Sequence, residues 1–128
     1  MTLILDSGGL SALVSDRAKL AELRRRGLWP GHVPSVVLAE SLTGDHRRDF
    51  HTNRLLRACQ VRDVDEAQAR AAARLRTATG SAPSISAVDA IVAAFASGCV
   101  DPVVLTGGPG DLTKLAAHAV RPITVVGV

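Results

Sequence analysis

The chain has 128 residues, of which 47% are hydrophobic and 21% charged, and its formal net charge is +3. This length predicts one domain, residues 1–128, large enough to bury a hydrophobic core without disulfide or metal staples. One Trp, two Phe and no Tyr argue against the aromatic platforms on which single-strand-binding proteins stack bases, so the core must consist of Leu, Val, Ile and Ala.

Basic residues are mostly arginine, because Lys19 and Lys114 are the only lysines among 15 basic side chains. Arginine suits bidentate contacts to phosphate, although a GC-rich genome would give the same bias. Cys59 and Cys99 are far apart and lack metal-binding neighbours, which is typical of reduced thiols in a cytosolic protein. No apolar run has transmembrane length and no signal peptide is recognisable. We therefore expect a cytoplasmic protein with no membrane partner.

The first element is a short apolar strand at residues 2–5 that ends abruptly in Asp6, Ser7, Gly8 and Gly9. Helical spacing of leucines then resumes at Leu10. Asp6 has two interpretations at this point. It is either the N-cap of the following helix, or a functional carboxylate at the carboxyl edge of a sheet, where α/β proteins bind ligands.

The rest of the chain alternates between strand and helix patterns. Strands are expected at 32–36, 60–64, 102–106 and 123–126, and helices at 16–27, 37–44, 45–59, 65–80, 86–97 and 111–118. Two helix starts carry capping patterns, Asp65 with Gln68 and Ser86 with Asp89. Such alternation predicts βαβ crossovers, and hence a parallel sheet between layers of helices.

Three carboxylates are isolated in otherwise apolar sequence. Asp6 is the only charged side chain before Asp16. Glu40 is the only Asp, Glu, Lys or Arg between Arg26 and Asp45. Asp89 is the only charged side chain between Arg76 and Asp101. Burying an unpaired carboxylate costs several kcal/mol, so such groups are usually paired or bound to a metal ion.

Together these positions favour convergence of Asp6, Glu40 and Asp89 on one cation. Hard oxygen ligands in small number fit Mg²⁺ or Mn²⁺. Taken singly, each residue has a structural alternative: Glu40 as an exposed helix residue, which its apolar neighbours disfavour, and Asp89 as the third residue of its capping pattern.

Other chemistries lack their motifs. There is no G-x-S-x-G elbow for a serine hydrolase, and the glycine-rich segment 107–110 lacks the lysine of a phosphate-binding loop. The four histidines, His32, His46, His51 and His118, have no zinc-ligand spacing. No residue pattern singles out nucleic-acid contacts.

Four blocks of the sequence resemble PIN domains, and most closely those of VapC-type toxins from toxin–antitoxin pairs. The blocks are LILDSGGLSAL, VPSVVLAESL, SISAVDAIVAAFA and VVLTGGPGDLTKLA, at residues 3–13, 33–42, 84–96 and 103–116. The resemblance implies a three-layer α/β/α fold with a mainly parallel sheet. It assigns Asp6, Glu40 and Asp89 as metal ligands and places Ser7 and Thr106 near the metal. It further implies a Mg²⁺- or Mn²⁺-dependent endoribonuclease, a homodimer, and a small antitoxin whose tail enters the active site.

The chain departs from the family pattern at one position. Gly108 stands where related domains commonly have an acid after the fourth strand, and Asp111 matches a second acid often found nearby. Two functions therefore remain open: an RNA-cleaving toxin in which Asp111 completes the catalytic acids, or a catalytically weak or degenerate PIN domain that binds RNA or protein. Asp111 also has a simpler interpretation, as an acid favoured by the helix dipole in a first turn.

Overall fold

Five parallel strands form the sheet that organises the chain in the computed structural model, which describes residues 1–128. In chain order the strands are β1 (Thr2–Leu5), β2 (His32–Pro34), β3 (Gln60–Arg62), β4 (Pro102–Thr106) and β5 (Thr124–Gly127). Their order across the sheet is β3-β2-β1-β4-β5, and every pairing is parallel. Parallel neighbours need crossover connections, so β1 in the centre receives helices on both faces.

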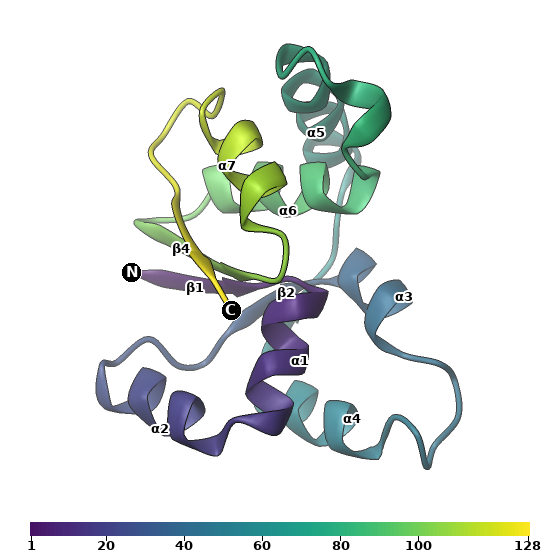
Figure 1. The fold of residues 1–128 in the computed structure, drawn as a ribbon, viewed down its shortest axis with the longest axis vertical. Helices are drawn as coiled ribbons and strands as arrows, with labels where there is room; N and C mark the ends of the chain where they lie inside the picture. The colour runs from purple at the N-terminus through teal and green to yellow at the C-terminus, as the bar shows by residue number, and fades with distance from the viewer.

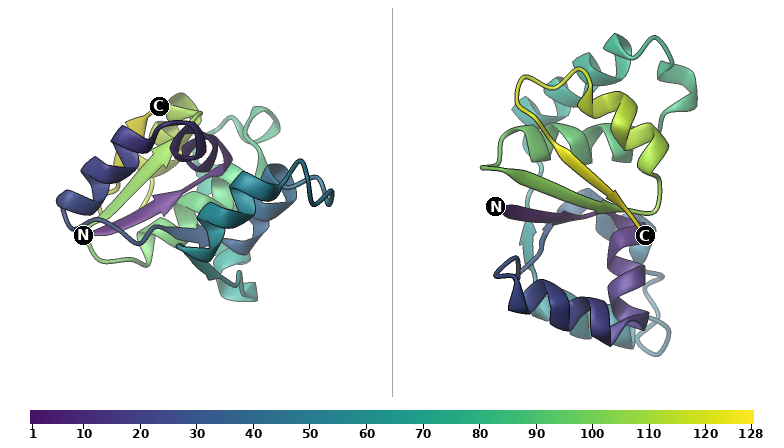
Figure 2. Two further views of the ribbon diagram at one scale, coloured as in Figure 1. Left: turned by 90° about the horizontal axis from the view of Figure 1, so that it is seen from below. Right: turned by 60° about the vertical axis from the view of Figure 1, so that its left-hand side comes forward.

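Helices cover the two faces of the sheet as separate layers (Figure 1). One layer holds α1 (Ser7–Ser15), α2 (Arg17–Arg25), α3 (Leu38–Ser41) and α4 (Phe50–Arg57), and the other holds α5 (Glu66–Ala78), α6 (Ala87–Ser97) and α7 (Pro109–Ala116). The right-hand view in Figure 2 shows the same division, with α1 and α2 below the sheet and α6 and α7 above it. Two 3₁₀ turns, η1 (Ser35–Val37) and η2 (Ala82–Ser84), complete the elements. The predicted three-layer α/β/α fold is confirmed.

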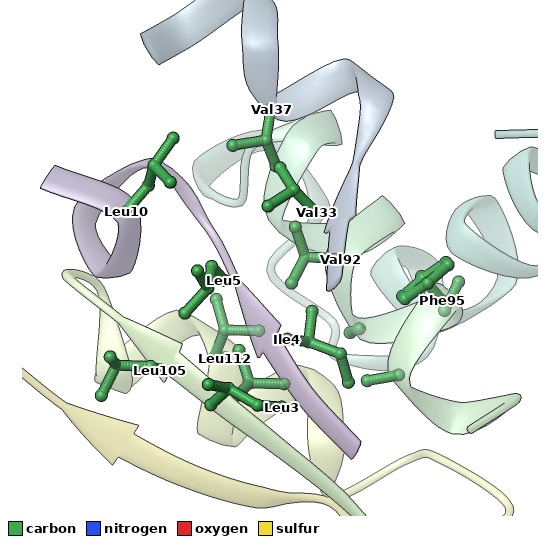
Figure 3. Close-up of a cluster of buried hydrophobic side chains, with 14 of the residues drawn as sticks. Leu3, Ile4, Leu5, Leu10, Val33, Val37, Val92, Phe95, Leu105 and Leu112 are labelled. Carbon is green, nitrogen blue, oxygen red and sulfur yellow. The ribbon is translucent and has the colours of Figure 1, made fainter. Parts of the chain in front are cut away.

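The core lies on both sides of β1. Leu3, Ile4 and Leu5 are at most 1% exposed, and Figure 3 shows them between Leu10 of α1 and side chains of the opposite helical layer. Fully burying such a side chain contributes about 1.5–3 kcal/mol. α6 is the most buried helix, with Ala90 and residues 92–96 all buried. No helix is long and apolar enough to cross a membrane.

Most predicted elements lie within two residues of the observed ones, but the helix expected at 37–44 spans only Leu38–Ser41. Three further differences have local reasons. The strand expected at 32–36 ends at Pro34, because η1 follows it directly. The helix expected at 45–59 spans only Phe50–Arg57, since Asp49 holds the segment before it in turns. The helix expected at 111–118 begins at Pro109, a residue that suits a first helical position because it needs no N–H partner.

Glycines allow the end of β1 to press against the end of β4. A Cβ on Gly8 would lie 2.5 Å from the Cα of Gly107, and one on Gly9 would overlap the carbonyl oxygen of Leu105. Helix α1 therefore starts in direct backbone contact with the turn that follows β4. This contact determines where Asp6 lies relative to β4.

Replacing Gly9 by Ala should lower the free energy of unfolding by roughly 3 kcal/mol, because backbone at Leu105 has no room to yield. Gly110 is the matched control: it lies in the first turn of α7 with nothing near its missing Cβ. Gly110→Ala should raise stability by about 0.5–1 kcal/mol. Urea unfolding of both variants checks this, and equal effects would contradict the close contact.

Candidate functional site

Asp6 is a buried carboxylate at the carboxyl end of the central strand, with 5% of its surface exposed. Its Oδ1 accepts a hydrogen bond of 2.8 Å from the Gly9 N–H, so it is the N-cap of α1. Its Oδ2 accepts a hydrogen bond from the Thr106 hydroxyl on β4. An ionised carboxylate offers about four lone-pair positions, so this one keeps acceptor capacity for a further ligand.

Thr106 is completely buried and connects Asp6 to the following turn. Its Oγ1 accepts a 2.9 Å hydrogen bond from the Gly108 N–H, which directs the hydroxyl proton toward Asp6. Chains of this kind polarise one another and strengthen each bond. Gly108, where the resemblance implied an acid, thus supports Asp6 through its backbone. Because this contact spans 100 residues of sequence, only the fold reveals it.

Asp89 lies in the first turn of α6, where the Ser86 hydroxyl caps the helix by accepting from the Asp89 N–H. Burial raises the pKa of its carboxyl, and the negative charge of Asp6 raises it further. The Ser86 hydroxyl opposes this rise, while the charges of Asp111 and Glu40 add to it. The charges of three other carboxylates therefore reach Asp89 at one end of the sheet.

Glu40 projects from α3 and is exposed, although its apolar neighbours in the sequence favoured burial. It lines a small pocket beside Ser7, the first residue of α1. Its short helix is followed by a loop that Asp49 holds closed. The carboxylate of Asp49 is 5% exposed and accepts bonds from the Thr43 N–H and hydroxyl and from the Gly44 N–H.

Sequence reasoning missed Asp49, which lies in a basic segment and has no isolated-charge signal. The backbone N–H of Thr43 is the main cause of its lowered pKa. Hydrogen bonds to the charged form favour that form, so Asp49 is ionised. Its bonds to Thr43 and Gly44 hold the loop between α3 and α4 in place. It acts on the site only by positioning the segment that carries Glu40.

Asp111 is partly buried in the first turn of α7, as the sequence predicted. A carboxylate there interacts favourably with the helix dipole by roughly 0.3–1 kcal/mol. Its negative charge also raises the pKa of Asp89, which places Asp111 at the same end of the sheet as the other acids. Both interpretations of Asp111 are therefore compatible with its position.

No basic side chain forms an ion pair with these four acids. The two ion pairs of the molecule, Arg25–Glu22 and Arg70–Glu66, lie on exposed helix surfaces. No three Asp, Glu, His or Cys side chains converge into a ready-made cation cage. Mg²⁺, however, usually binds through one or two carboxylates together with waters and substrate phosphates. An all-oxygen, uncompensated donor set that includes the fixed Asp6 and the nearby Asp89 fits such an ion.

The profile of the PIN domain family matches residues 3–106, which include every strand but β5. The chain belongs to the PIN domain family. None of the curated proteins searched matches the chain.

Solved structures share the fold of this PIN domain along its whole length. A chain of the DNA-bound VapBC structure from Salmonella typhimurium superposes with a TM-score of 0.73 at 16% identity, covering 99% of this chain and 98% of that one. VapBC2 from Rickettsia felis, bound to a promoter DNA fragment, gives 0.72 at 13% identity, with 100% and 99% covered. VapBC-1 from nontypeable Haemophilus influenzae gives 0.71 at 14%, with 99% and 98% covered. The predicted resemblance to VapC-type PIN domains is thus confirmed for the fold.

Asp89→Asn should stabilise the metal-free PIN domain in a pH-dependent way. The folded-state pKa of Asp89 is raised above its ordinary value of 3.8, so the native state holds this proton more strongly than the unfolded chain. Ionisation therefore costs stability as pH rises from about 3.8 through the raised pKa, and the cost is complete above it. The asparagine avoids that cost.

Melting temperatures in EDTA between pH 4 and pH 8 measure this effect. The variant should melt above the wild type at pH 7, with the difference shrinking toward pH 4. A variant that is less stable at pH 7, or a difference independent of pH, would show that burial and the neighbouring charges do not raise the pKa of Asp89.

Proposed function

We propose that this PIN domain is a divalent-metal-dependent endoribonuclease, the toxin of a type II toxin–antitoxin pair that acts in the cytoplasm. The observation that carries the proposal is the group of four carboxylates, without a basic partner, at the carboxyl edge of a parallel sheet. That edge is where α/β proteins bind ligands. The likeness of the fold to chains in VapBC structures supports the toxin assignment.

In this proposal Asp6, Glu40 and Asp89 hold Mg²⁺ or Mn²⁺. When bound, the ion polarises a phosphate oxygen and lowers the pKa of water, which prepares water to attack the phosphodiester. Asp6 is held rigidly by Gly9 and Thr106 and therefore fixes the position of the ion. Ser7 begins α1 beside it, and its hydroxyl is available to substrate. Glu40 is exposed, so it can meet the ion together with the RNA.

A degenerate PIN domain that only binds RNA or protein is the second candidate. Gly108 favours it, because its backbone supports Thr106 but supplies no acid. The uncompensated charge of Asp6, Glu40 and Asp89 opposes it. A domain without metal chemistry gains nothing from keeping mutually repelling carboxylates together.

The cleavage test separates these candidates. The purified protein should cut single-stranded RNA with Mg²⁺ or Mn²⁺ and not with EDTA. Replacing Asp6 or Asp89 by Asn should reduce cleavage by at least about 100-fold, a typical cost of losing one electrostatic contact to a transition state. The control Glu22→Gln removes only an exposed ion pair on α2 and should cut normally. No cleavage by the wild type would leave only the binding module, and equal cleavage by all variants would place the activity outside this site.

Asp111→Asn belongs in the same assay with Mg²⁺ varied. If Asp111 serves the metal, as we propose, cleavage should fall at low Mg²⁺ and partly recover as Mg²⁺ is raised. If it only supports α7, the variant loses roughly 0.3–1 kcal/mol of stability and keeps the metal dependence of the wild type. That second outcome would reduce the site to three carboxylates.

A groove of about 420 Å³ between α1, α2 and α4 supports a protein partner. Its floor is apolar, formed by Leu13, Val14, Leu20 and Leu55, and its rim is basic, formed by Arg17, Arg24, His51 and Arg54. An apolar floor with a cationic rim complements an amphipathic segment carrying acidic residues. We assign this groove to the cognate small antitoxin.

A second, more apolar groove supports a homodimer. Leu38, Leu42, Leu56 and Val61 line about 330 Å³ between α3, α4 and β3, and Val61 is 41% exposed. Asn53 and Arg57 are the only polar side chains that line it, so a second copy of the chain would cover a mainly apolar surface.

Co-expression with a candidate antitoxin, sought as a short protein encoded by the adjacent upstream gene, tests the first surface, and sedimentation of the toxin alone tests the second. Arg54→Glu should weaken that complex at least about tenfold, because it places an acid opposite an acidic segment. Arg74→Glu on the exposed face of α5 is the control and should leave the affinity unchanged. Sedimentation should give the toxin the mass of a dimer at micromolar concentration. A monomer, or equal loss of affinity in both variants, would contradict these assignments.

A further inference from the structure

A small polar pocket lies beside the acids, enclosed by α1, α3 and α4, which adjoin one another in the lower right of Figure 1. Its volume is about 320 Å³, at the lower end of the range for small-molecule sites. Its wall is formed by Ser7, Gly8, Leu10, Ser11, Glu40, Ser41 and Thr52. Four hydroxyls and one carboxylate thus line the pocket, and Leu10 is its single apolar side chain.

Ser41 distinguishes this pocket from an ordinary surface hollow. Its Oγ is buried and has no hydrogen-bond partner, which is rare because an unpaired buried hydroxyl costs about 1–3 kcal/mol. Alanine at this position would remove the cost without creating a cavity of any size. Ser41 also lines the pocket, so rotation about its Cα–Cβ bond would turn the hydroxyl toward a ligand, which would supply the missing partner.

The chemistry of the wall indicates which part of a nucleotide fits. Reading a purine edge uses bidentate Arg, Asn or Gln side chains, and RNA bases also stack on aromatic rings; none of these residues lines the pocket. A hydroxyl both donates and accepts, and so does the ribose 2′-hydroxyl, which distinguishes RNA from DNA. The pocket also shares Ser7 and Glu40 with the proposed metal site, so its occupant would adjoin the reacting phosphate.

We propose that this hydroxyl pocket binds the ribose of a nucleotide next to the scissile phosphate and that Ser41 contacts its 2′-hydroxyl. The inference rests on the proposed nuclease function and deepens it, since it names the feature by which the site selects RNA. Thr52, which faces the same pocket from α4, is the second hydroxyl in the contact.

The test compares an RNA oligonucleotide having one cleavage site with versions carrying a single 2′-deoxy sugar on either side of that site. For the wild type, one of these substitutions should lower kcat/KM by roughly 3–10-fold, the worth of one net hydrogen bond. Ser41→Ala should lower kcat/KM on the all-RNA substrate by a similar factor and should no longer respond to that 2′-deoxy substitution. Thr77→Ala, at an exposed position of α5, is the control and should behave as wild type.

The melting temperature of Ser41→Ala should equal or exceed that of the wild type, which separates a substrate contact from a folding defect. Thr52→Val is the second variant if Ser41→Ala folds poorly. A full response to every 2′-deoxy substitution in both variants would overturn the proposal, and so would equal cleavage of RNA and DNA by the wild type.

Failure of the nuclease function gives a different result, because the wild type would then cut no substrate. The pocket is in that case tested by fluorescence anisotropy, with labelled RNA and its single 2′-deoxy versions binding to Asp89→Asn. A 3–10-fold preference for the 2′-hydroxyl at one position, lost in the Asp89→Asn/Ser41→Ala double variant, supports the pocket. Equal affinities overturn it.

Discussion

The Asp6 carboxylate joins three parts of the molecule through two hydrogen bonds. Its Oδ1 starts α1 by accepting from Gly9, and its Oδ2 holds β4 by accepting from Thr106. The first bond is local, whereas the second joins β1 to β4 where α1 begins directly against the end of β4, a contact that only glycine permits at positions 8 and 9. A different residue at either position would separate the helix from the strand and move the carboxylate. The geometry of the candidate site is therefore built into the sheet.

Keeping four acids at this edge lowers the free energy of unfolding, and the rest of the fold offsets this loss. Burial and the neighbouring charges disfavour ionised Asp89, and Ser41 contains an unpaired buried hydroxyl. The well-packed core around β1 supplies the compensating stability, as its three inward residues are almost inaccessible. Proteins tolerate such local violations where a ligand relieves them. A cation between the acids and a ribose at Ser41 would each relieve one of them.

Much of the architecture could be predicted from the sequence, because periodicity and caps are local signals. The strand at 2–5, the capping box at Asp65 and the parallel alternation are all present in the structure. Isolation of Asp6, Glu40 and Asp89 among apolar residues predicts a shared cation site, and that assignment stays a prediction. The exposure of Glu40 could not be predicted, since its apolar neighbours occupy other faces of a very short helix.

Sequence patterns could not predict the contacts between distant segments. The Thr106 hydroxyl meets Asp6 only because β1 and β4 are adjacent and in register, with Leu5 opposite Leu105. Asp49 carries no signal in its basic segment, yet it shapes the loop after Glu40. The hydroxyl pocket likewise gathers residues from three helices. Strand order and helix placement, which are tertiary properties, decide all three features.

The central claim is that the carboxyl edge of this sheet holds a divalent cation. Anomalous diffraction from crystals soaked in Mn²⁺ at neutral pH tests it most directly, because the method locates the ion without reference to activity. The account predicts a peak within coordination distance of the Asp6 and Asp89 carboxylates, at about 2.0–2.2 Å from their oxygens. No peak at this edge, or a peak only among unrelated surface acids, would contradict the claim.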